Sequence, residues 1–137
     1  MGKHERGFTL VELITVIILV SIISVSVFSR LGSVSSANLQ ASRDDIIAAL
    51  FFAQQTAMAR SNIQLVVTSH SVSVTENGTP IVVHSKGYPL TLESGVTATA
   101  ASLTYDKLGR TTATTIGLSS SSGASASIVV EASGYAH

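Results

Sequence analysis

A single carboxylate stands inside the longest apolar stretch of the sequence. Glu12 lies four residues after Phe8, and no other charged side chain occurs between Phe8 and Phe28. Moving a carboxylate to the middle of a bilayer costs about 2.5 kcal/mol or more. An acid in such a place therefore predicts a function, and it needs a cationic or hydrogen-bonding partner.

The other residues with catalytic or metal-binding potential form no recognisable constellation. His70 and His84 flank an Asn-Gly turn without a nearby carboxylate or thiolate, so they make an incomplete zinc site. The adjacent Asp44 and Asp45 point about 100° apart on a helix and have no third ligand nearby. No serine lies in a Gly-x-Ser-x-Gly elbow. The sequence predicts no enzyme activity, no catalytic residue, no metal and no cofactor.

The apolar stretch is long enough to cross a membrane. Phe8 to Phe28 covers about 21 residues, and a helix of that length spans roughly 30 Å. Lys3 and Arg6 precede the stretch. By the positive-inside rule the amino end stays in the cytoplasm, and residues beyond about 30 are translocated.

Three interpretations of this segment differ in where the chain is cut. A secretory signal would be cut after the apolar core, near 35–37, and a plain anchor would stay uncut. A third cut, between Gly7 and Phe8, would free an α-amine one helical turn from Glu12. Only this cut supplies the acid with an opposite charge, which attracts it strongly in a low dielectric.

The residues around this cut resemble a type IV prepilin signature. "RGFTLVEL" has a short basic leader, a glycine, a phenylalanine, and a glutamate four residues beyond it. The resemblance implies that prepilin peptidase cuts after Gly7 and methylates the new amino-terminal Phe8. It also implies that Glu12 pairs with the amine of a neighbouring subunit during filament assembly. Major pilins commonly carry a proline near the position of Ser29, whereas this chain has none before Pro80.

A second helical pattern follows the apolar stretch. Within 38–60, apolar residues recur on one stripe at Leu39, Ile46, Leu50, Ala53 and Ala57, widened by Ile47, Phe51 and Met58. We expect one helix from Phe8 to about Arg60, with Phe52 partly exposed. Residues 1–7 are then the leader, 8–30 the transmembrane or filament-core half of the helix, and 31–60 its amphipathic half.

The remaining residues, 61–137, predict a β-rich head in the periplasm. The period changes to two in "IQLVVTSHSVSVT" and "PIVVH", and Asn77-Gly78 between them is a strong hairpin signal. We expect six or seven short, mostly antiparallel strands against the helix, an α+β fold like that of type IV pilins. Charged residues are only 12% of the chain, and the fold must do without disulfides because there is no cysteine.

Three further segments of the sequence resemble particular subclasses of this family. "FFAQQTAMARSN" (51–62), "YDKLGR" (105–110) and "EASGYAH" (131–137) resemble H-type pseudopilins of general secretion, FimT-like minor pilins, and minor pilins of the mannose-sensitive haemagglutinin pilus. The resemblance implies a minor pilin of a type IV pilus, a fimbrium used in cell adhesion. This subunit would cross the bacterial inner membrane once and assemble with other pilin subunits.

Two alternatives stay open beside the minor pilin. One is an H-type pseudopilin of a type II secretion system, whose partners would be other pseudopilin subunits. The other is a DNA-binding uptake subunit, which some FimT-like relatives are by virtue of a basic tail. The segment 131–137 has no Lys or Arg and the formal net charge is zero, so the sequence argues against a DNA partner.

Overall fold

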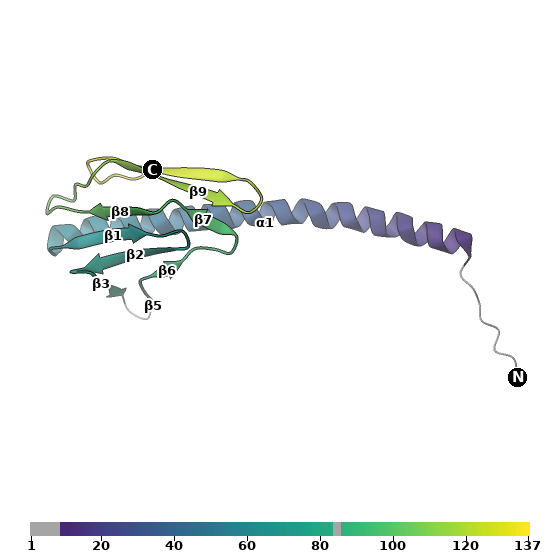
Figure 1. The fold of residues 1–137 in the computed structure, drawn as a ribbon, viewed down its shortest axis with the longest axis horizontal. Coiled ribbons are helices and arrows are strands. Elements are labelled where there is room, and N and C mark those ends of the chain that lie inside the picture. The colour runs from purple at the N-terminus through teal and green to yellow at the C-terminus, as the bar shows by residue number, and fades with distance from the viewer. Residues whose placement is uncertain (1–8, 84–85) are drawn as a thin grey trace, which may run out of the picture. The chain divides into compact units, whose positions relative to one another are not determined.

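One long helix precedes all the strands (Figure 1). The computed structural model describes residues 9–83 and 86–137. Helix α1 runs from Leu10 to Ala59 without a break. The chain divides into two compact units, Met1–Val34 and Ser35–His137, so α1 contributes to both. The second unit, called the head below, contains every strand.

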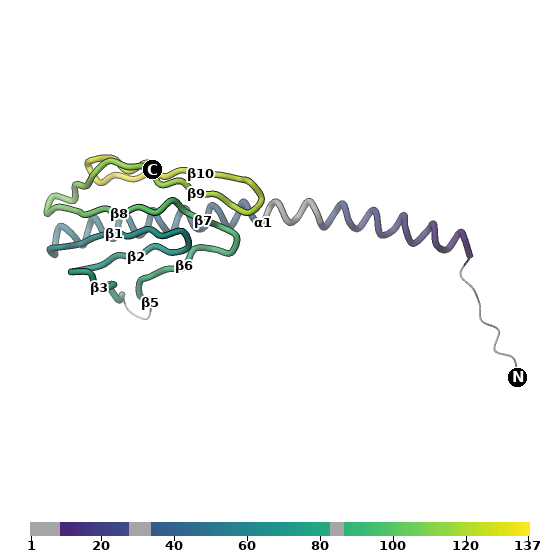
Figure 2. Tube along the Cα trace, in the orientation of Figure 1, coloured from purple at the N-terminus to yellow at the C-terminus, as the bar shows by residue number. Residues whose placement is uncertain are grey.

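The strands form two sheets and a small hairpin, and every pairing is antiparallel. The first sheet has the order β3-β2-β1-β8, with β6 also paired to β2, and the second has the order β10-β9-β7. Figure 2 follows the chain through them. The strands are β1 (Ile63–Val67), β2 (Ser71–Glu76), β3 (Thr79–Pro80), β4 (Val82–Val83), β5 (Lys86–Gly87), β6 (Leu90–Thr91), β7 (Val96–Ala98), β8 (Ala101–Thr104), β9 (Thr114–Ser120) and β10 (Ser125–Val130).

The predicted turn at Asn77-Gly78 is confirmed. It joins β2 to β3, and its two residues have positive φ angles of 52° and 82°. The number of strands was predicted too low, because short strands of two or three residues leave little periodicity to recognise. The run 63–75 was also wrongly read as continuous alternation. It is two strands joined by a turn in which the Thr68 hydroxyl accepts a hydrogen bond from the Ser71 N–H at 3.1 Å.

The helical half of the core lies on the predicted stripe. Its buried residues include Leu39, Ile46, Leu50, Ala53 and Ala57, while Ile47 is half-buried. Phe51 and Met58 were wrongly placed in the core, since they are 38% and 52% exposed. The buried stripe is displaced around the helix from the predicted one. It includes Ser42 and Ala49 on one side and leaves out Phe51 and Met58 on the other.

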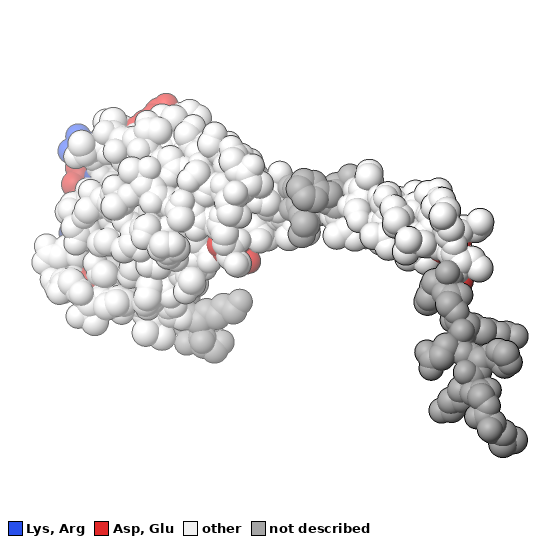
Figure 3. All heavy atoms as spheres, turned by 45° about the vertical axis from the view of Figure 1, so that its right-hand side comes forward, with Lys and Arg blue, Asp and Glu red and all other residues white. Residues whose placement is uncertain are grey.

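The buried face of α1 and both sheets share one core. Leu65, Val74 and Leu103 come from the first sheet, and Ile116 and Ile128 come from the second. Phe52 is half-buried, as expected, and stacks on Tyr88 with ring centroids 5.7 Å apart. On the face in Figure 3, charged atoms of the head occupy only small, separate areas. The arrangement is α+β and is consistent with a type IV pilin-like fold.

Candidate functional site

The first described turn of α1 carries Glu12. Thr9 precedes the helix, and its hydroxyl oxygen accepts a hydrogen bond from the Glu12 N–H at 3.2 Å. Thr9 is therefore the N-cap, and Thr-x-x-Glu is the capping-box spacing that starts helices. The Thr-x-x-Glu spacing is visible in the sequence, but the role of Thr9 as the N-cap was not predicted. A carboxylate in the first turn also interacts favourably with the helix dipole.

The segment after this turn is apolar on all sides. Leu10–Val27 is long and apolar enough to cross a membrane by length and composition. Its large side chains are 46% to 74% exposed, so none is covered by another part of the described chain. This surface requires lipid or another apolar surface around it.

The hydroxyl groups of this segment are satisfied within the helix. Thr15, Ser21 and Ser24 donate to the carbonyl oxygens four residues earlier, at 2.5, 2.7 and 2.7 Å. By contrast, the Glu12 carboxylate has no hydrogen bond or ion pair among the described residues. Among the described residues of the segment, the Glu12 carboxylate is thus a charged group that needs a partner from beyond them.

The processing residues Gly7 and Phe8 lie outside the described residues, and so does His84 of the rejected zinc pair. His70 shares a 2.8 Å hydrogen bond between its Nδ1 and the Ser69 hydroxyl, and Asp44 accepts one from Gln40 at 2.9 Å. Within 9–83 and 86–137, no group of three or more His, Cys, Asp or Glu side chains could hold a metal ion.

A polar junction centred on Gln54 joins the turns at 105–110 and 131–137. The Nε2 of Gln54, on α1, donates to the carbonyl oxygens of Gly109 and Ser133, both at 3.1 Å. These acceptors belong to the turns at 105–110 and 131–137. Sequence reasoning missed the role of Gln54 because its partners are 55 and 79 residues away along the chain.

Two glycines allow the three elements to approach this closely. Gly109 and Gly134 have positive φ angles of 73° and 86°. A Cβ atom on Gly109 would lie 2.9 Å from Gln54 Cγ, and one on Gly134 would lie 2.5 Å from Gln54 Nε2 and overlap the Gly109 carbonyl oxygen. The junction therefore depends on glycine at both positions.

Asp106 organises the first of these turns. Its carboxylate accepts hydrogen bonds from the backbone N–H groups of Arg110 and Leu108, at 2.8 and 2.9 Å, and pairs with the Arg110 guanidinium at 2.8 Å. The Arg110 backbone N–H above all, with the other two donors, lowers the pKa of Asp106. The "YDKLGR" phrase thus encodes a carboxylate-capped turn.

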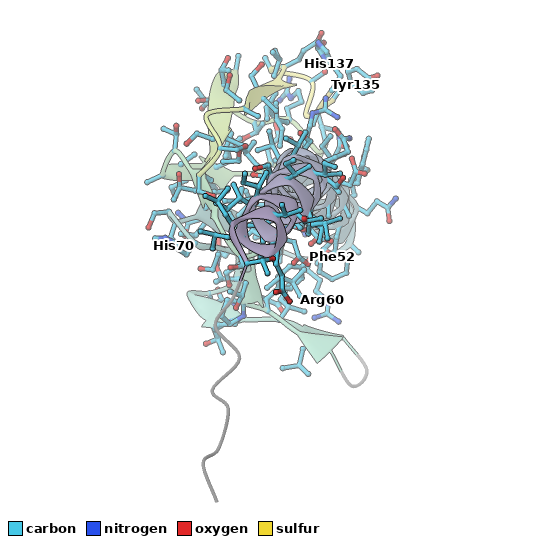
Figure 4. The ribbon with its side chains drawn as sticks, turned by 90° about the vertical axis from the view of Figure 1, so that its right-hand side faces the viewer. Phe52, Arg60, His70, Tyr135 and His137 are labelled. Carbon is cyan, nitrogen blue, oxygen red and sulfur yellow. The ribbon has the colours of Figure 1, made fainter. Side chains whose placement is uncertain are left out.

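The second turn continues into a short pairing with β10. Val129 and His137 exchange backbone hydrogen bonds at 2.9 and 3.1 Å, and Glu131 N–H donates to the Tyr135 carbonyl at 2.8 Å. Figure 4 shows Tyr135 and His137 side by side, with ring centroids 5.4 Å apart. The "EASGYAH" phrase thus covers part of the edge of β10.

Comparison with known families matches the amino-terminal residues. Residues 2–28 match the prokaryotic N-terminal methylation motif. Comparison with curated proteins gave no significant match, and neither did comparison with solved structures. Residues 2–28 are therefore a type IV prepilin-like signal, which indicates membrane anchoring, processing of the pilin or pseudopilin type by prepilin peptidase, and assembly with other pilins.

Proposed function

We propose that the chain is a minor pilin, a structural and assembly subunit of a type IV pilus similar to the mannose-sensitive haemagglutinin pilus. Prepilin peptidase cuts between Gly7 and Phe8 and methylates Phe8. The subunit then crosses the bacterial inner membrane once, with its head in the periplasm, until it enters the filament. Residues 8–30 form the membrane or filament-core half of the helix, 31–60 the amphipathic half, and 61–137 the β-rich part of the head.

The observation that carries the proposal is a carboxylate, within a matched methylation motif, that has no partner in the part of the chain that the structure describes. Residues 2–28 match the motif, and Glu12 has no partner among the described residues of the apolar segment. The cut after Gly7 produces an α-amine, whose pKa of about 7.7–8.0 leaves it largely protonated at neutral pH. Pairing this amine with Glu12 of a neighbouring subunit compensates two charges that would each be costly in an apolar filament core.

Mass spectrometry of the purified chain tests the processing step. Co-expression with prepilin peptidase should remove residues 1–7 and add one methyl group to Phe8, while a Gly7→Leu variant should keep its full length. The Leu side chain should block cutting because the residue before the cut must fit a narrow protease site. Cleavage after Ala37, or normal processing of Gly7→Leu, would contradict the proposal.

A pseudopilin of type II secretion is the second candidate, because the phrases at 105–110 and 131–137 resemble H-type pseudopilins as well as minor pilins. Deleting the gene separates the two functions, because loss of surface pili supports the minor pilin and loss of secreted protein supports the pseudopilin. The third candidate, DNA binding, is not favoured, since 131–137 has no Lys or Arg.

A further inference from the structure

The hairpin turn between β2 and β3 contains a reactive pair of residues. Asn77 is followed directly by Gly78, and both residues are exposed. In such a pair the backbone nitrogen of the glycine can attack the side-chain amide carbon of the asparagine. Glycine has no side chain to hinder this attack, and nothing lies within 4 Å of a Cβ atom placed on Gly78. The Gly78 nitrogen is therefore sterically open for reaction with the Asn77 amide.

The other two asparagines of the chain have bulky, buried neighbours on the carboxyl side. Asn38 is followed by Leu39, which lies within α1. Asn62 is followed by Ile63, the first residue of β1. In both cases the branched side chain hinders the approach of the backbone nitrogen to the asparagine amide. Asn77 is therefore the asparagine at which this attack is sterically favoured.

The side chain of Asn77 is held by Asn62, which lies fifteen residues away along the chain. The Asn62 Nδ2 donates a hydrogen bond to the Asn77 Oδ1 at 2.7 Å, and the Asn77 N–H donates to the Asn62 carbonyl oxygen at 3.1 Å. The β2–β3 turn and the start of β1 both lie at the end of the head where α1 ends (Figure 1). The two asparagines thus tie this turn to the residue that precedes β1.

Attack on the Asn77 amide would require its side chain to leave this position. The ring that forms contains the Gly78 nitrogen together with the carbonyl carbon, Cα, Cβ and Cγ of Asn77. Because such an imide ring is nearly planar, Cγ must eclipse the backbone carbonyl carbon, whereas side chains rest in staggered rotamers. The hydrogen bond to Asn62 fixes the amide, so it has to break as Cγ turns.

We propose that Asn77 is a site of spontaneous deamidation and that the Asn62 side chain slows the reaction. The Gly78 nitrogen loses its proton to solvent base and bonds to Cγ of Asn77. The bond from Cγ to Nδ2 breaks, and Nδ2 takes up a proton and leaves as ammonia. Water then opens the cyclic imide to a carboxylate. One water is consumed, one ammonia is released, and nothing is oxidised or reduced.

The two ways of opening the ring have different structural consequences. Cleavage of the bond from the Gly78 nitrogen to Cγ leaves an ordinary aspartate at position 77, whose side-chain oxygen can still accept the Asn62 hydrogen bond. Cleavage of the bond to the backbone carbonyl carbon leaves an isoaspartate, which adds one atom to the main chain of the turn. Thr79 then cannot pair with Glu76 in its present register. The first product keeps the turn, and the second disrupts it.

Peptide mapping by mass spectrometry tests the proposal on the full natural chain in mild detergent. The chain is held in mildly alkaline buffer, folded in one sample and unfolded by guanidinium chloride in another. The replacement of each amide NH2 by OH is followed with time. In the folded sample we expect Asn77 to be converted ahead of Asn38 and Asn62. In the unfolded sample, which lacks the bond to Asn62, conversion of Asn77 should be at least about fivefold faster.

A pair of variants tests the role of the Asn62 side chain. Asn62→Gly removes the side-chain amide and still tolerates the positive φ of 58° at this position. Deamidation at position 77 should become about fivefold faster, which corresponds to one hydrogen bond of about 1 kcal/mol. The control Gln64→Ala removes a nearby side-chain amide that donates to the Ser102 hydroxyl at 2.7 Å instead. This control should leave the rate unchanged.

Three outcomes would overturn the inference. Absence of conversion at Asn77, or earlier conversion at Asn38 or Asn62, would show that the turn is not the reactive site. Equal rates in the folded and unfolded samples would show that the fold gives Asn77 no protection. Equal rates for folded Asn62→Gly and Gln64→Ala would show that the Asn62 amide does not restrain Asn77. The comparison of folded and unfolded natural chains needs no variant, so it decides even where Asn62→Gly fails to fold.

Discussion

Alanine at position 134 should destabilise the head far more than alanine at position 123. Gly134 and Gly123 have nearly the same backbone conformation, with φ angles of 86° and 87°. A Cβ on Gly134 would overlap the Gly109 carbonyl oxygen and lie 2.5 Å from Gln54 Nε2, whereas nothing lies within 4 Å of a Cβ on Gly123. The pair therefore separates backbone strain, which both variants share, from the loss of the junction.

The magnitude follows from the contacts that must be broken. The left-handed conformation costs alanine about 1–2 kcal/mol relative to glycine at either position. To make room at position 134, the Gln54 amide must lose its two hydrogen bonds, at about 1 kcal/mol each, and the turn must move away from α1. We expect the free energy of unfolding to fall roughly 2–4 kcal/mol further for Gly134→Ala than for Gly123→Ala.

The assay is urea unfolding of the full chain in mild detergent, followed by brief proteolysis that destroys unfolded heads. With a urea dependence of about 1–3 kcal/mol per molar, the midpoint should be at least about 0.7 M lower for Gly134→Ala than for Gly123→Ala. Gln54→Ala should cost less in the Gly134→Ala background than in the natural chain, because the two residues share the junction. Equal midpoints for the two alanine variants would refute the junction's structural role.

Three more predictions concern the core and the first turn. Leu50→Asp should lower the free energy of unfolding by about 3–5 kcal/mol in the same urea assay, since it buries an unpaired charge. The control Gln55→Asp, at an exposed position of the same helix, should change it little. Similar losses for the two variants would disprove the packing stripe. Tyr105→Phe should be neutral or stabilising, because the buried hydroxyl has no partner among the described residues; burial raises the pKa of Tyr105 to about 12, so absorbance at 295 nm should show this phenol ionising last. The lowered pKa of Asp106 predicts stability that is present above the unfolded-state pKa of about 3.9 and lost as pH falls through the folded-state pKa; an acid unfolding midpoint unchanged by Asp106→Asn would contradict this.

Local patterns explain which parts of the fold could be predicted from the sequence. The period of 3.6 located the buried stripe through Leu50, and Asn77-Gly78 located a hairpin because both residues tolerate positive φ. Periodicity could not decide Phe51 and Met58 at the margin of the stripe, because their burial depends on where the remote turns end. It also missed buried Ser42, whose hydroxyl accepts a hydrogen bond from a distant backbone N–H.

The Gln54 junction could not be predicted from the sequence either, because its hydrogen bonds join residues that are far apart along the chain. The glycines of "YDKLGR" and "EASGYAH" are typical of turns, but nothing local in the sequence indicates that both segments contact Gln54. The run 63–75 held a usable signal that the prediction overlooked. Its buried apolar residues are odd-numbered through Val67 and even-numbered from Val72, and this change of phase marks the turn between β1 and β2.

The central claim is that Glu12 serves assembly, and a filament-incorporation assay of Glu12→Val tests it most directly. Thr15→Val is the matched control, since it also removes a polar group from the segment, but one already bonded to the Val11 carbonyl within the helix. Both variants should insert into the membrane and lose residues 1–7, and Thr15→Val should enter filaments at the natural level. We predict that Glu12→Val accumulates in the inner membrane, because the Phe8 amine of a neighbouring subunit lacks its counter-charge. Glu12→Val that copurifies with its partner pilins at the natural level would contradict the account.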